Sequence, residues 1–87
     1  MDYVGMAREI NRESPVPPSR QVAGWLREDI ELGAYAPGQR LPSIADLVQT
    51  YGVARDTAAK ALRILVSEGL AETSQGMGTY VGDDQQK

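Results

Sequence analysis

The chain has 87 residues, with nine Lys and Arg against twelve Asp and Glu and a formal net charge of −3. It contains neither Cys nor His, which excludes a disulfide scaffold, a Cys/His zinc site and a Ser-His or Cys-His catalytic pair. A chain of this length forms one small domain, and an acidic balance by itself argues against nucleic acid as a partner. No segment has the roughly 20 apolar residues of a membrane span, so we expect a cytoplasmic protein without a membrane partner.

Residues 1–17 are predicted to form an N-terminal extension. Apolar side chains at helical spacing allow a short helix over residues 2–12, with a frayed arm as the alternative. The sequence "SPVPPS" at residues 14–19 then breaks any helix, because proline lacks the backbone N–H and clashes with the preceding turn.

A helix is predicted after these prolines, with Ser19 as its N-cap and Gly33 at its end. Its apolar face has helical spacing and consists of Val22, Ala23, Leu26 and Ile30. The sequence "YAPGQRLP" at residues 35–42 predicts a turn followed by a short extended piece.

A second helix is predicted after Ser43, because Asp46 three residues later makes a variant capping box. Gly52 ends it, and the turn "YGVA" leads into a third helix from about Arg55 to Glu68. The buried face of the third helix is expected to consist of Ala58, Ala61, Leu62, Leu65 and Val66.

The sequence "AETSQGMGTYV" at residues 71–81 predicts a β-hairpin with a glycine-rich tip. Two helices joined by a short turn and followed by a hairpin predict a winged helix-turn-helix over residues 18–82. The expected fold class is therefore mainly α with a small β-hairpin, and residues 83–87 are expected to be a disordered polar tail.

Arg55 stands where the helix dipole disfavours a cation, at the first turn of the third helix. A recognition helix inserts that end into the major groove, where arginine binds guanine O6 and N7 and discriminates by ~1–3 kcal/mol. Asp56 is expected to accept a hydrogen bond from cytosine N4 or to hold Arg55 in place.

The remaining outward positions of the third helix fit the same hypothesis. Ala54 and Ala59 are small enough to let DNA approach or to contact a thymine methyl group, and Lys60 lies beside the stripe that Arg55, Ala59 and Arg63 form. The alternative is a solvated face of mixed charge, in which Asp56 and Lys60 support the helix as an i, i+4 pair.

Phosphate contacts are expected from three further residues. Ser43 lies at a helix N-terminus, where free N–H groups favour an anion, although a plain N-cap is the simpler interpretation. Thr57 either reaches a phosphate or bonds back to its own helix, and Arg40 lies at the edge of the one segment with a basic excess, residues 32–63.

The hairpin tip, with Gln75, Gly76 and Met77, has the small residues that allow approach to a minor groove. A simple hairpin loop is the alternative, because the turn needs its glycines in any case.

Residues 18–81 resemble the winged-helix DNA-binding domain of the GntR family of bacterial transcription regulators. The resemblance is carried by Pro37-Gly38, Leu41-Pro42-Ser43, Gly52-Val53, Arg55, Thr57, Ala61-Leu62, Glu68-Gly69-Leu70 and the run from Gly76 to Val81. It implies that Ser43 and Thr57 contact the DNA backbone, that Arg55 reads a base, and that Gln75 and Gly76 enter the minor groove. It also implies a dimer on a near-palindromic double-stranded operator, usually with repression as the outcome.

The chain departs from the family pattern at three positions. The family usually has an arginine where this chain has Ala45, often has another where it has Ala59, and commonly has Ser or Thr where it has Ala54. Each lost phosphate contact is expected to lower the salt dependence of binding by roughly one unit of slope. Members also carry a C-terminal effector domain, so the chain is expected to be either an excised domain or a stand-alone regulator.

The sequence therefore predicts a sequence-specific DNA-binding transcriptional regulator, a repressor by the family's usual behaviour. The alternative is a protein-interaction module that binds DNA weakly or not at all. No enzyme is expected, because the carboxylate pairs at residues 28–29 and 83–84 lack the surroundings that tune a catalytic pKa. No cofactor and no metal are expected, and a homodimer is possible on the family's pattern.

Overall fold

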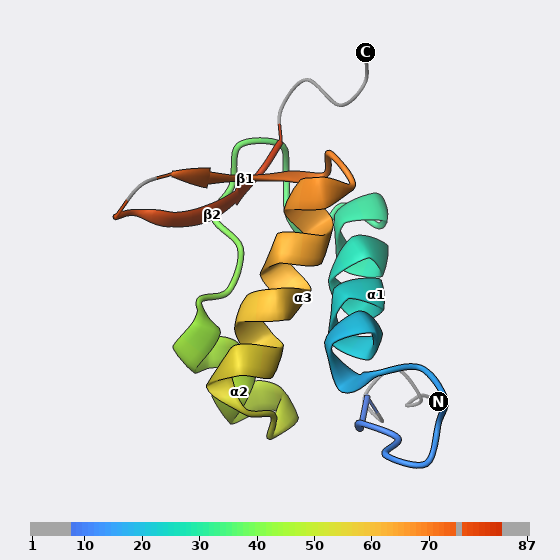
Figure 1. The fold of residues 1–87 in the computed structure, drawn as a ribbon. Coiled ribbons are helices and arrows are strands. Elements are labelled where there is room, and N and C mark those ends of the chain that lie inside the picture. The colour runs from blue at the N-terminus through green and yellow to red at the C-terminus, as the bar shows by residue number, and fades with distance from the viewer. Residues whose placement is uncertain (1–7, 75, 83–87) are drawn as a thin grey trace.

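The computed structural model describes residues 8–74 and 76–82. Three helices precede a two-stranded antiparallel hairpin, which confirms the predicted fold class (Figure 1). In chain order the elements are α1 (Pro18–Glu31), α2 (Ile44–Tyr51), α3 (Arg55–Ser67), β1 (Ala71–Ser74) and β2 (Gly78–Val81). None of the described helices has the length and apolar character needed to cross a membrane.

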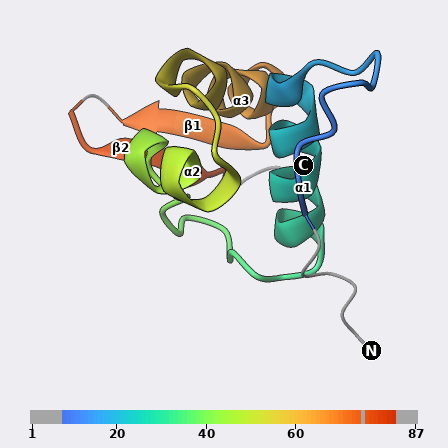
Figure 2. The same ribbon diagram turned by 90° about the horizontal axis from the view of Figure 1, so that it is seen from below.

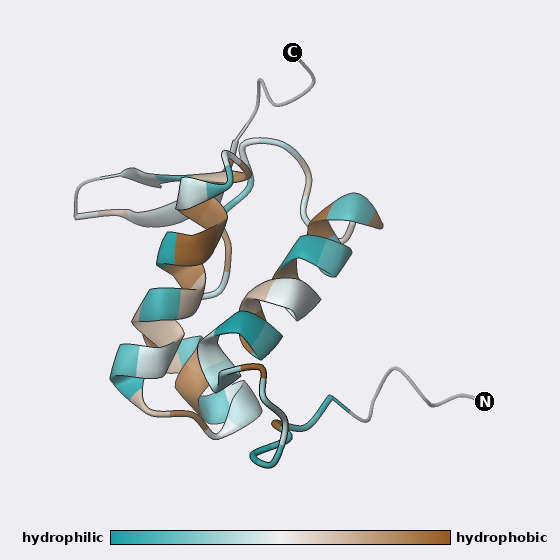
Figure 3. Ribbon diagram, turned by 45° about the vertical axis from the view of Figure 1, so that its right-hand side comes forward, coloured by the Kyte–Doolittle hydropathy of each residue, from teal (hydrophilic) through white to brown (hydrophobic). Residues whose placement is uncertain are grey.

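The core lies between α1 and α3, which pack side by side (Figures 1 and 3). Ala23, Ala58 and Ala61 are completely buried there, and their small side chains allow the two helix backbones to approach closely. Larger apolar side chains fill the space around them, namely Val22 and Leu26 from α1, Leu47 from α2, and Leu62 and Leu65 from α3. The predicted apolar faces of the helices are thus the faces that form the core.

Helix α1 begins two residues earlier than a cap at Ser19 implies, and the expected cap at Ser19 is wrong. Pro17 occupies the N-cap position in extended conformation, and Pro18 is the first helical residue. Proline suits that position because its fixed φ matches a helix and its missing N–H has no partner there in any case. The other end agrees with the sequence, since Gly33 follows the helix with a φ of 86°.

Helix α2 has the predicted capping box and the predicted glycine stop. The Ser43 hydroxyl accepts from the Asp46 N–H at 3.0 Å, and the Asp46 carboxylate accepts from the Ser43 N–H at 3.1 Å. Gly52 is left-handed with a φ of 69°, which turns the chain toward α3. Since only residues 52–54 separate α2 from α3, the two helices form the expected helix-turn-helix.

The hairpin that forms the wing is joined to a third extended segment. The Leu41 N–H donates to the Thr79 carbonyl at 2.8 Å, and the Val81 N–H donates to the Gln39 carbonyl at 2.8 Å. The predicted extended piece before Pro42 is therefore present, although it amounts to a single bridge between Arg40 and Tyr80. This pairing fixes the base of the wing next to the start of α2.

The short helix considered for residues 2–12 does not extend through residues 8–12, which are irregular. Side chains bind the backbone locally instead: Asn11 Oδ1 accepts from the Glu13 N–H at 3.0 Å, and Ser14 Oγ accepts from the Val16 N–H at 3.0 Å. Such bonds compete with helical ones. Residues 1–7 and the tail predicted at 83–87 lie outside the described residues.

Candidate DNA-binding interface

Tyr51 of α2 stacks on Trp25 of α1 with ring centroids 5.2 Å apart, so α2 contacts both other helices. The wing extends away from α1, on the same side as α2 (Figures 1 and 2). Between α2 and the wing is a groove of about 440 Å³, lined by α2, α3 and both strands of the wing.

The groove brings together Ser43, Arg55 and Gly76, which come from three separate segments. The sequence predicts each of them as a DNA contact. Ala45, one of the departures from the family pattern, lines the same groove.

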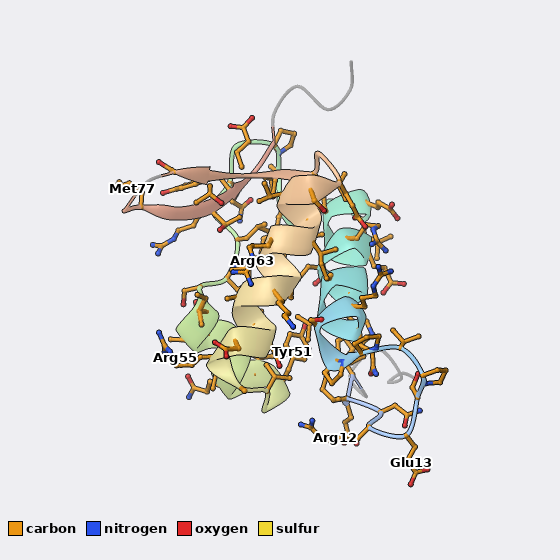
Figure 4. The ribbon with its side chains drawn as sticks, viewed as in Figure 1. Arg12, Glu13, Tyr51, Arg55, Arg63 and Met77 are labelled. Atoms are coloured by element: carbon orange, nitrogen blue, oxygen red, sulfur yellow. The ribbon has the colours of Figure 1, made fainter. Side chains whose placement is uncertain are left out.

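Arg55 is the first residue of α3, and its side chain is exposed and directed outward (Figure 4). Ala54 precedes it as an exposed N-cap whose side chain cannot accept a hydrogen bond from the helix. The ion pairs of the described residues involve Arg8 and Arg27 but not Arg55. Arg55 therefore presents a guanidinium group at the helix end where the protein's own dipole disfavours it.

The neighbouring charges do not neutralise this arginine. Asp56 is exposed, and the hydrogen bonds between described residues include none from Arg55 to Asp56. Lys60 and Arg63 are exposed as well, and Ala59 is half-buried. Lys60 and Arg63 do not line the groove, so α3 presents Arg55 to the groove and exposes two further cations outside it. Figure 4 shows Arg55 and Arg63 at different heights of α3.

Two backbone N–H groups at the start of α2 remain available to a ligand despite the capping box. The box uses the N–H groups of Ser43 and Asp46, while those of Ile44 and Ala45 belong to the first turn, where no intrahelical acceptor exists. Ser43 is half-buried and Ala45 is exposed. Thr57 is half-buried on α3, and its hydroxyl forms no hydrogen bond with another described residue.

Arg40 pairs with Tyr80, and its side chain runs along the wing to Gly78, next to the tip. A Cβ atom placed on Gly78 would come within 2.9 Å of Arg40 Nε, so the arginine side chain occupies the space that only glycine leaves open. A second concave surface, next to the groove, is lined by Arg40, Ser43 and Asp46. The exposed guanidinium of Arg40 thus belongs to the surface between the wing and the start of α2.

The tip of the wing projects from the body of the protein (Figures 1 and 4). Gly76 has a φ of 75°, and the Met77 N–H donates to the Ser74 carbonyl at 2.9 Å to close the turn. Met77 is 59% exposed at this tip. Gln75, which the sequence also proposed for this tip, lies outside the described residues.

Sequence reasoning did not include Thr73 and Ser74, whose side of β1 lines the groove. Both are exposed, small and polar. The available sequence signal was the run of three polar residues, Glu72, Thr73 and Ser74, because a strand with one buried face alternates apolar and polar residues. In the structure all three are exposed, whereas Ala71 is buried.

Residues 18–81 match the family described as bacterial regulatory proteins, gntR family. The mannosyl-D-glycerate transport/metabolism system repressor MngR of Escherichia coli is 43% identical over 68 residues, which cover 78% of this chain and 28% of that protein. The histidine utilization repressor of Klebsiella aerogenes is 40% identical over 72 residues, which cover 83% of this chain and 30% of that protein. The chain therefore spans less than a third of the length of these relatives.

Two solved structures share this fold. AraR(DBD) in complex with operator ORX1 has a TM-score of 0.78 and 34% identity, with 85% of this chain and 94% of that chain covered. YtrA from Sulfolobus acidocaldarius, a GntR-family transcription factor, has a TM-score of 0.77 and 36% identity, with 86% and 79% covered.

Proposed function

Because the chain belongs to the GntR family of bacterial regulatory proteins, we propose that residues 18–82 bind operator DNA by sequence and regulate transcription, as a repressor. The named relatives are repressors, and AraR(DBD) is similar over most of this chain in a complex with its operator. These findings favour DNA binding over the protein-interaction module. The family and its named relatives are regulators and not enzymes, and a regulator of this kind works in the cytoplasm.

The observation that carries the proposal is the exposed guanidinium of Arg55, at the first turn of α3 and in a groove shared with Ser43 and the wing. Helix α3 enters the major groove at that end, and Arg55 donates two hydrogen bonds to guanine O6 and N7. Asp56 accepts from cytosine N4, while Ala54 and Ala59 allow the close approach and contact thymine methyl groups.

Backbone contacts hold α3 in register. Ser43, with the free N–H groups at the start of α2, binds one phosphate, and Thr57 binds another from the first turn of α3. Arg40 and Lys60 add charge at the edges of this surface, where phosphates carry most of the affinity. The wing tip, with Gln75, Gly76 and Met77, approaches the minor groove.

The proposal is tested by selecting duplexes from a random-sequence pool with the unaltered chain and then measuring binding of two variants. Arg55→Ala should weaken binding to the selected duplex by about 5- to 150-fold, the equivalent of ~1–3 kcal/mol, and relax the preference at one base pair. Arg63→Ala removes the same charge from α3 outside the groove. It should weaken binding to all sequences alike and leave the preference intact.

Failure to enrich any duplex at low salt would exclude the proposed function. If Arg55→Ala kept the full sequence preference, Arg55 would not be the base reader, even though the chain binds DNA.

A further inference from the structure

The N-terminal segment is anchored to α1 at two residues shortly before Arg12, namely Arg8 and Asn11. The Arg8 guanidinium donates to both carboxylate oxygens of Asp29, each at 2.9 Å. The Asn11 backbone is held twice by Gln21, whose Oε1 accepts from the Asn11 N–H and whose Nε2 donates to the Asn11 carbonyl, both at 2.9 Å. The backbone that carries Arg12 is therefore fixed by tertiary contacts.

These contacts direct Arg12 toward the start of the proposed recognition helix. Arg12 Nη2 donates to the Gly52 carbonyl at 3.3 Å, and Gly52 precedes Arg55 by three residues. In Figure 4, Arg12 and Arg55 both lie at the lower end of the molecule, with Arg55 to the left of Tyr51 and Arg12 to its lower right, and Glu13 points further away.

The charge of Arg12 is not neutralised within the described part of the chain. Arg8 and Arg27 each form ion pairs with carboxylates, whereas the ion pairs there include none to Arg12. Its side chain is exposed, and the single bond to Gly52 uses one of five guanidinium N–H donors. A favourable contact with the C-terminal end of α2 accounts for its direction but leaves four donors free.

We propose that Arg12 binds a phosphate of the DNA backbone beside the major groove that α3 enters. This inference rests on the proposed function, since a helix in a groove about 12 Å wide has phosphates on either side of its inserted end. An arginine fixed next to Gly52 stands beside that end. It supplies a cation that Ala45 and Ala59 do not supply.

The experiment measures the dissociation constant for the selected duplex between 50 and 200 mM salt, for the unaltered chain, Arg12→Gln, Arg12→Lys and Arg27→Gln. Arg12→Gln should lower the salt slope by about 0.9 per bound chain, so its loss of affinity shrinks about threefold across this range. Arg12→Lys should retain the slope because it retains the charge. Arg27→Gln, which removes the same charge from an arginine paired with Glu68, should also retain it.

A salt slope that is unchanged in Arg12→Gln would overturn the assignment, and so would a loss of affinity by the same factor at every salt concentration. The latter is what a purely structural bond to Gly52 predicts. An equal loss of slope in Arg27→Gln would also overturn it, since net charge alone would then be the cause. If the unaltered chain bound no DNA, both this inference and the proposed function would fail.

Discussion

At the scale of single residues, Gly78 and Arg40 are interdependent. Gly78 has a φ of 115°, a conformation that side chains rarely adopt, and its missing Cβ leaves space for the Arg40 guanidinium. One glycine thus permits the turn into β2 and also sets the position of a cation on the proposed DNA surface.

Gly78→Ala should therefore affect stability and binding through separate causes. The backbone strain should lower the free energy of unfolding by about 1–3 kcal/mol, measured by urea denaturation. The new methyl group should also displace Arg40 and weaken DNA binding. In the double variant with Arg40→Ala the stability loss should persist, because strain and not the displaced side chain causes it. A double variant as stable as Arg40→Ala alone would contradict this account.

At the scale of elements, α2 depends on its N-terminal cap. It has only eight residues, of which Leu47 is buried in the core and Ile44, Val48 and Tyr51 are partly buried against it. Helices this short are marginal without tertiary support or capping. The reciprocal bonds between Ser43 and Asp46 satisfy two N–H groups and fix the turn that leads from the extended segment before Pro42 into α2.

Ser43→Ala should lower the free energy of unfolding by about 1 kcal/mol, seen as a lower urea midpoint with an unchanged slope. Ser67→Ala is the matched control, because Ser67 Oγ donates to the Ile64 carbonyl at 2.8 Å inside α3 and caps no helix N-terminus. We expect the control to cost much less. Equal losses in the two variants would argue against a special role for the capping box.

The elements also show which structural features local sequence patterns can predict. Gly52 and the Ser43–Asp46 spacing act through contacts within a few residues, so local patterns predicted them correctly. The cap at Ser19 was wrong because Pro17 and Pro18 fix the backbone before a side-chain cap can form. The Arg40–Gly78 contact joins residues 38 positions apart, and no local rule reports such a pairing.

At the scale of the whole molecule, an acidic chain exposes four cations around the groove. The net charge is −3, yet Arg40, Arg55, Lys60 and Arg63 are all exposed around α3 and the wing. On the far side, Arg8 and Arg27 are paired with carboxylates of α1 and of Glu68. Arg20 on α1 is also exposed and belongs to none of the ion pairs of the described residues, so one free cation there compares with four around α3 and the wing. This distribution favours attraction of DNA to the face that carries the groove.

One such domain reads only a short site, which limits its affinity and its specificity. A single module buries about 600–1,000 Å² on DNA, less than most specific protein–DNA interfaces. We therefore expect two chains to bind one operator as a symmetric pair. The selected duplexes should then contain inverted half-sites with centres about 10 base pairs apart or a multiple of that spacing. Sedimentation should give two chains per duplex, and inserting five base pairs between half-sites should abolish cooperative binding. Selection of one unrepeated half-site, with one chain per duplex, would show instead that the chain acts as a monomer.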